Sequence, residues 1–268
     1  MNKCIFTITV STAREVTRQA IFYCIVFGGI LLILFSFSFT LFAFGEETKM
    51  IREMGISTIT ICCLCLTSLS AANAISREIE KGTIMTLLSK PVSKKSILLG
   101  KFFGILAVVF LAFMVMGIFM TVSLCVKDSL EYHISLSTSF AKVGYAAIFR
   151  LVFSFLQVSI MCTIAIAGSI YLPLVSNLSC CMFIYIIGNL THFFLYLFQG
   201  NEGGFSWYVT FFYVFFPNLE SFYTIGMESG SVKPFSVGYM VLLALYAILY
   251  MTFVITLACE FFDKKECV

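Results

Sequence analysis

The chain has 268 residues, of which 60% are hydrophobic and only 12% are charged, and its mean hydropathy is +1.01. A soluble domain carries about twice this charged fraction, so the composition excludes the soluble globular class and indicates a polytopic membrane protein. The net charge of +3 is small and the sequence has no basic tail, so nothing in it indicates nucleic-acid binding.

The first predicted element is a mildly amphipathic segment from Lys3 to Gln19. It combines Lys3, Arg14 and Arg18 with apolar residues, and no small-residue cleavage site follows the next apolar run. We therefore expect no cleavable signal peptide. The segment predicts an interfacial helix that leads into the first membrane span.

Six apolar runs are long enough, at about 1.5 Å per residue, to cross a hydrocarbon core of about 30 Å. A further apolar stretch before the last run is too short to cross and is typical of a re-entrant or interfacial segment. We predict an all-α integral membrane protein with one transmembrane domain over residues 1–268. The predicted spans are 20–44, 55–75, 97–126, 143–170, 178–198 and 238–261, with outer loops at 45–54 and 127–142 and an outer re-entrant segment at 205–220.

The basic residues are distributed unequally among the predicted loops. Most of the 17 Lys and Arg residues lie in the N-terminal segment, in the loop between the second and third spans, or in the C-terminal tail. Basic residues in short loops stay on the side from which the chain inserts. We therefore predict a multi-pass protein of the cytoplasmic (inner) membrane with both termini in the cytoplasm.

The loop at 76–96, between the second and third predicted spans, is the most strongly patterned polar segment. Within it, Ile84, Leu87 and Leu88 are spaced i, i+3, i+4, and Pro91 closes the run. This pattern predicts a short helix with one apolar face, lying beneath the membrane and joined to the third span. A soluble partner can push on such an element.

Three strings in and beside this loop, REIEKGT, LLSKPVS and ILLGK, resemble the first cytoplasmic loop of type-2 ABC exporter permeases. That group includes the permease component of multi-copper enzyme maturation systems. An FPNLESF pattern before the last span is also similar to the family, so the resemblance reaches both halves of the chain. It implies a coupling helix that docks on an ATPase subunit. The residues expected to couple to the ATPase are Arg77, Glu78, Glu80, Lys81, Gly82, Thr83, Leu87, Leu88 and Pro91.

The sequence contains no phosphate-binding loop, because its only Gly-Lys pair, Gly100 and Lys101, is followed by Phe102 instead of Ser or Thr. We therefore expect no enzymatic activity, catalytic residue, cofactor or metal in this chain. The resemblance implies that ATP and Mg are bound by two copies of a separate ATPase subunit. It also implies a second permease copy, either identical or similar to this chain.

Cysteine and methionine residues offer a weak indication of a Cu(I) site. Cys62 and Cys65 have C-x-x-C spacing, and Met114, Met116 and Met120 carry soft thioethers that suit Cu(I). The simpler interpretation is that these residues are small or flexible packing groups in lipid. We expect reduced thiols and no structural disulfide.

Arg150 is the only full charge well inside a predicted span. Such residues usually face the bundle interior or water, so Arg150 is a candidate for a translocation path, where it would meet an anionic group of a substrate. The alternative is that its side chain extends to the outer interface. Glu220, in the FPNLESF turn, is a second candidate for the path, or else a capping residue of the turn.

The resemblance implies the permease subunit of an ATP-driven ABC transporter that exports an unidentified substrate across the cytoplasmic membrane. The alternative is an ABC-type mechanotransmitter or scaffold that acts on a periplasmic partner, for example in metalloenzyme maturation, without moving a solute. A membrane-embedded enzyme is disfavoured because the sequence shows no cluster of His, Asp or Glu near one interface.

Overall fold

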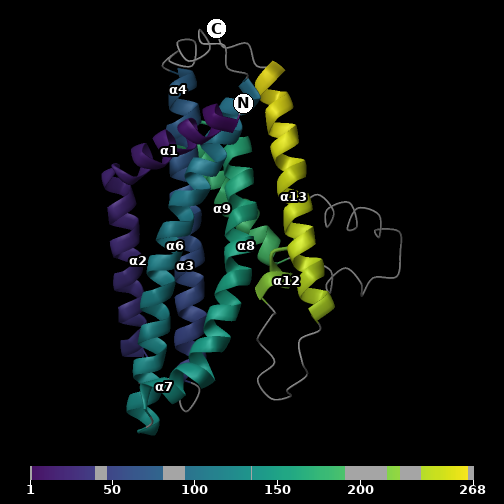
Figure 1. Ribbon diagram of the computed structural model, residues 1–268. Helices are drawn as coiled ribbons and strands as arrows, with labels where there is room; N and C mark the ends of the chain where they lie inside the picture. The colour runs from purple at the N-terminus through teal and green to yellow at the C-terminus, as the bar shows by residue number, and fades with distance from the viewer. Residues whose placement is uncertain are drawn as a thin grey trace.

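In the computed structural model, residues 2–39, 47–80, 94–133, 135–190, 216–223 and 237–264 are described, and every regular element in these ranges is helical (Figure 1). The prediction of an all-helical membrane protein is confirmed for this part of the chain. The elements are α1 (Asn2–Thr17), α2 (Ala20–Phe39), α3 (Glu47–Ala71), the π-helical turn η2 (Ala72–Ser76), α4 (Arg77–Glu80), α6 (Lys94–Tyr132), α7 (Leu136–Ser139), the π-helical turn η3 (Phe140–Gly144), α8 (Tyr145–Gly168), α9 (Leu174–Asn189), α12 (Glu220–Tyr223) and α13 (Val237–Lys264).

Four helical stretches are long and apolar enough to cross a membrane, and α1 with α2, bent by 66°, makes a fifth if the pair is one span. Helix α9 has 16 residues, about 24 Å, which is shorter than a hydrocarbon core of about 30 Å. The described residues thus give four to five candidate spans, against six predicted. The predicted span 178–198 continues beyond Leu190 into residues outside the described ranges. The four stretches are Glu47–Ser76, Lys94–Leu130, Tyr145–Gly168 and Gly238–Lys264.

Two segments predicted as outer loops are largely helical. Helix α3 begins at Glu47, about two turns before the span predicted from residue 55. Its first turn is held by an ion pair of 2.5 Å between Glu47 and Lys127 of α6. The segment 127–142 is occupied by the end of α6, α7 and the start of η3. Both segments can therefore be helical despite their charged residues, because Glu47 of α3 and Lys127 of α6 neutralise each other across the two helices.

The bundle has two distinct ends (Figure 1). The N-terminal part of α1, α4 and the C-terminal end of α13 lie together at the top of the view, and α7 lies at the bottom. We call these the loop end and the far end. At the loop end, Lys95 Nζ of α6 lies 3.5 Å from Asp263 Oδ2 of α13, and Lys94 Nζ donates to the Asp263 carbonyl at 3.4 Å. The loop end corresponds to the side predicted to face the cytoplasm.

Helix α3 is central, and α13 is peripheral. Helix α3 packs against α2, α6, α8 and α9, whereas α13 packs mainly on α8 and α6. In the most apolar stretch of each, 61% of the α3 span is buried but only 11% of α13. The apolar surface of α13 therefore faces lipid or another subunit.

Helix α1 lies across the start of α6 at very short range. A methyl group placed on Gly100 would lie 2.7 Å from Ile8 Cγ2, and one on Gly104 would lie 2.8 Å from the Thr9 carbonyl oxygen. Thr9 Oγ1 also donates to the Gly100 carbonyl at 3.2 Å. The Gly-x-x-x-Gly spacing allows the two backbones this approach. The Gly-Lys pair that does not form a phosphate loop thus belongs to a helix-packing motif.

The FPNLESF segment lies between α8 and the N-terminal half of α13 (Figure 1). The amide of Leu219, which is fully buried, donates to the Gly188 carbonyl of α9 at 3.1 Å. The Asn218 amide donates to Tyr246 Oη of α13 at 3.1 Å, and Asn218 Oδ1 accepts from the Ser221 amide at the start of α12. Irregular backbone at membrane depth requires such internal partners. Of the predicted re-entrant segment 205–220, only residues 216–220 lie within the described ranges.

Candidate functional site

The predicted coupling segment is described only at its two edges. Arg77, Glu78 and Glu80 form α4, with Arg77 exposed and Glu78 half-buried, and the side chain of Glu80 is outside the described part. On the other side of the segment, α6 begins at Lys94. The remaining predicted coupling residues, Lys81, Gly82, Thr83, Leu87, Leu88 and Pro91, all lie outside the described residues.

A π-helical turn sets the direction of α4. In η2 the Arg77 amide donates to the Ala72 carbonyl, five residues earlier, so that the hydrogen-bond ladder of α3 shifts by one residue. Ala72, Ala74, Ile75 and Ser76 are buried in this turn. Single π-turns within α-helices are uncommon and recur at functional sites. Here the turn lies between a membrane-spanning helix and the predicted coupling segment.

Lys101 of α6 holds this π-turn from the side. Its ammonium donates to the main-chain carbonyl of Ala74 and to the carboxylate of Glu78, and the side chain is 7% exposed. In the sequence, Lys101 was noted as a basic residue of the ILLGK string and as a lysine outside any phosphate-binding loop, and not as an ion-pair partner of Glu78. A cation inside an apolar helix signals a buried polar partner, and that signal was available to find it.

The bend between α1 and α2 contacts the same turn. Asn73 Nδ2 of η2 lies 3.4 Å from Gln19 Oε1, which follows α1. Glu15 of α1 adds a negative charge near the Lys101 ammonium. Three separate parts of the chain thus meet where the predicted coupling segment leaves the bundle.

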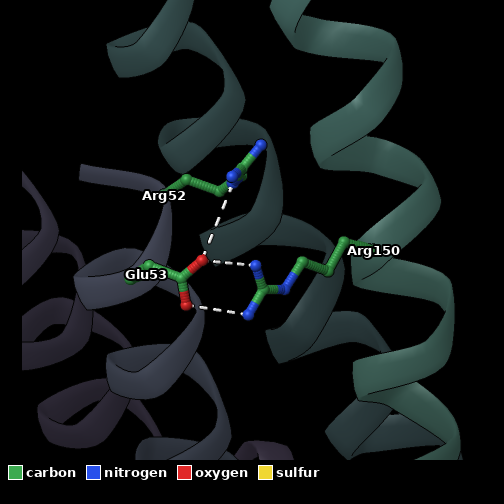
Figure 2. A network of polar contacts seen from close by, with 3 residues as sticks. All are labelled: Arg52, Glu53 and Arg150. Carbon is green, nitrogen blue, oxygen red and sulfur yellow. Dashed lines mark hydrogen bonds and ion pairs between the residues drawn. The ribbon is translucent and has the colours of Figure 1, made fainter. Parts of the chain in front are cut away.

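Arg150 of α8 faces the interior of the bundle, where Glu53 of α3 binds it (Figure 2). Its guanidinium pairs with both carboxylate oxygens of Glu53, with a distance of 2.8 Å from Nη2 to Oε2, and only 2% of the Arg150 side chain is exposed. Arg52 Nε lies 3.9 Å from Glu53 Oε1, the oxygen that also accepts from Arg150 Nη1. The Arg150 side chain therefore does not extend to the outer interface, which was the alternative prediction. Glu53 was missed because the prediction placed it in an outer loop.

Further polar contacts continue along α3, α8 and α9 toward the loop end. Thr60 Oγ1 lies 3.2 Å from Tyr185 Oη, and Gln157 Nε2 donates to Asn189 Oδ1 at 3.2 Å. Each polar group named is therefore paired with a neighbouring helix, as a dry interior requires. Together these contacts join the three helices into one unit.

Asn177 of α9 ends this row of contacts. It is fully buried, and its Nδ2 donates to the carbonyls of Ser68 at 3.3 Å and Ala165 at 3.1 Å. The turn between α8 and α9, residues 169–173, contains no charged residue. The buried amide of Asn177 anchors this turn.

Glu220, the second candidate for a translocation path, is the first residue of α12 and is half-buried. A carboxylate in the first turn of a helix is favoured by the local helix dipole. Helix α12 packs against α8, the helix that carries Arg150. The structure therefore places both candidates on neighbouring elements, and the role of each in transport stays a prediction.

An apolar cavity of about 700 Å³ lies between α8, α9 and α13. Its walls include Ile184, Pro217, Tyr246, Tyr250 and Phe253. The lining is almost entirely hydrocarbon and aromatic, so the cavity suits an alkyl chain better than an ion.

The sulfur-containing residues pack against glycines. A methyl group on Gly29 would lie 2.6 Å from Met116 Sδ and 3.2 Å from Cys62 Sγ, and one on Gly55 would lie 2.9 Å from Met120 Sδ. Such filling of narrow gaps is the ordinary use of Met and Cys in an apolar core. Among the described residues there is no group of three or more His, Cys, Asp or Glu side chains that could hold a metal ion.

The chain was compared with curated proteins and with models of protein families. No curated protein gives a significant match to it. Residues 38–265 match the family model described as ABC-2 family transporter protein, and the match covers most of the chain, from the end of α2 through α13.

Proposed function

The chain belongs to the ABC-2 family of transporter proteins and is a multi-pass membrane component of an ABC transporter, and we propose that it is the permease subunit. In this role it couples ATP hydrolysis by a separate subunit to export of a substrate across the cytoplasmic membrane. Family membership implies an ABC ATPase as partner. The proposed assembly has two ATPase copies and two permease copies, with the loop end in the cytoplasm.

One observation carries the proposal. One edge of the predicted coupling segment continues from α3 through η2 and α4, and the other edge continues into α6. The ion pair between Lys101 of α6 and Glu78 of α4 joins these two edges. A force applied to residues 81–93 therefore reaches α3 and α6 together. Attachment at only one edge would let the segment move without the bundle.

The proposed mechanism is mechanical. Closure of the ATPase dimer on ATP displaces the segment around Thr83 to Ser89. Helix α6 continues for 39 residues, about 58 Å at 1.5 Å per residue, and so carries the displacement from the loop end to the far end. Coupling of this kind requires two states that both sites bias.

The apolar lining of the cavity between α8, α9 and α13 favours an apolar substrate. The cavity volume of about 700 Å³ is in the range of small-molecule sites, and its wall offers no charged group among the residues that line it. The similarity to permeases of multi-copper enzyme maturation suggests a different version, in which the chain transmits force to a periplasmic partner. The packing of Cys62, Met116 and Met120 against glycines gives no support to a copper cargo.

The proposal is tested by reconstituting the purified chain in lipid vesicles with the ATPase that co-purifies with it. The expected result is that ATP hydrolysis depends on the permease and that a fluorescent lipid or alkyl probe moves across the bilayer with ATP. An ATPase that is retained and stimulated while no probe moves supports the mechanotransmitter alternative. If no ATPase is retained on the tagged chain, the permease proposal is wrong.

A further inference from the structure

One buried ammonium group joins the two ends of the predicted coupling segment. Lys101 of α6 donates to the Ala74 carbonyl inside the π-turn and to the Glu78 carboxylate beyond it. The residues between Glu78 and Lys101 include the whole of the segment 81–93. Opening this junction would release α4 from α6 and leave the two edges of the segment connected only through the packing of α3 on α6.

The burial of Lys101 makes the junction sensitive to either partner. The side chains of Lys101 and Glu78 are 7% and 24% exposed, so solvent replaces neither interaction fully. A buried ion pair becomes strongly unfavourable when one charge is removed and the other remains. Lys95, six residues earlier on α6, provides the contrast, because its pair with Asp263 is 59% and 40% exposed and such surface pairs contribute little.

The bond to Ala74 distinguishes this junction from an ordinary ion pair. A lysine that only neutralised Glu78 would not need a main-chain acceptor. By binding a carbonyl within η2, Lys101 also fixes the turn that sets the direction of α4. A π-turn differs from a regular α-helical turn by one residue in its hydrogen-bond ladder, and coupling between distant sites requires an element with two such discrete arrangements.

We propose that Lys101 is a positioning residue for coupling, which locks the π-turn and α4 to α6 so that residues 81–93 move with both helices. This rests on the proposed function, in which an ATPase docks on that segment. Lys101 touches neither nucleotide nor substrate and acts through η2 and α4.

The test compares Lys101→Met with Lys101→Arg, Glu78→Gln and the control Lys95→Met. Each variant is purified as the full chain with its ATPase and placed in lipid nanodiscs. Three quantities are measured: the amount of ATPase retained, the permease-dependent rate of ATP hydrolysis, and the hydrogen exchange of amides 72–80. Gel filtration establishes which variants are folded.

The expected result is that Lys101→Met and Glu78→Gln retain the ATPase but lose permease-dependent hydrolysis by at least about fivefold. Amides 72–80 exchange faster in both variants, because the turn is no longer held. Lys101→Arg, which can still donate to both acceptors, and Lys95→Met behave as the unaltered chain does. If Lys101→Met does not fold, the Glu78→Gln variant tests the proposal in its place, because it removes the charge with little change in shape.

Two outcomes would overturn the inference, and they are distinguishable. If the folded variants show faster exchange but hydrolyse ATP as the unaltered chain does, Lys101 has a structural role only and the proposed function stands. If the unaltered chain itself retains no ATPase, the proposed function fails and the coupling role of Lys101 fails with it.

Discussion

At Arg150 the cost of placing a charge in an apolar helix is offset by one specific partner. The guanidinium and the Glu53 carboxylate meet through two hydrogen bonds, and Arg52 approaches Oε1, the carboxylate oxygen that also accepts from Arg150 Nη1 (Figure 2). Paired donors and acceptors of this geometry form the strongest ionic contacts in proteins. The residue therefore joins α8 to α3 whatever else it does in transport.

Replacing either partner alone is expected to destabilise the bundle. Arg150→Met takes both guanidinium hydrogen bonds from the Glu53 carboxylate, for which Arg52 at 3.9 Å compensates only in part, and we expect a loss of about 3 kcal/mol in the free energy of unfolding. The double variant Arg150→Met with Glu53→Leu removes both charges and is expected to recover much of that loss. Denaturant titration in mild detergent measures both, with Lys95→Met as a surface control.

A double variant as unstable as Arg150→Met would contradict this account of the pair. It would show that the shape of the arginine, or a contact of Arg150 other than that with Glu53, carries the stabilisation.

At the level of elements, α1 and α6 pack at short range because two positions of α6 at their contact carry no side chain. Gly100 and Gly104 allow Ile8 and Thr12 of α1 to rest directly on the α6 backbone. Since α6 begins where the predicted coupling segment ends, α1 is fixed to the same mechanical unit. The interfacial helix predicted from the sequence is therefore also a brace for the start of α6.

Enlarging Gly104 is expected to separate these helices. A Cβ at this position meets the Thr9 carbonyl at 2.8 Å, and main-chain atoms cannot rotate away as a side chain can, so Gly104→Leu forces α1 from α6. The measurement is hydrogen exchange of the amides of α1, which we expect to become faster when α1 no longer packs on α6. Gly28→Leu is the matched control, because nothing lies within 4 Å of a Cβ at Gly28.

Unchanged hydrogen exchange of α1 in the Gly104→Leu variant would show that the short contact between α1 and α6 does not hold these helices in place.

At the scale of the whole molecule, the sequence predicts what depends on local hydrophobicity. Helices α6 and α13 contain the predicted spans 97–126 and 238–261 from end to end, because a long apolar run must be helical in lipid. The all-helical class and the ABC-2 family are confirmed, whereas a count of six spans is not reached among the described residues.

The pairings between helices could not be read from the sequence. Glu53 and Arg150 are 97 residues apart, and Lys101 lies 23 residues from Glu78. Which charges meet depends on which helices pack together and at what height, and hydropathy says nothing about either. The extension of α3 to Glu47 was missed for the same reason, since its charged first turns are stabilised by α6 and α8.

The central claim is that residues 81–93 receive an ATPase at the cytoplasmic side. The most direct test is crosslinking from a cysteine introduced at Thr86 to the co-expressed ATPase, in a background from which the exposed Cys24 and Cys180 have been removed. We expect a crosslink whose yield changes with nucleotide. Labelling of position 86 by impermeant thiol reagents from outside the cell would contradict both the topology and the coupling role.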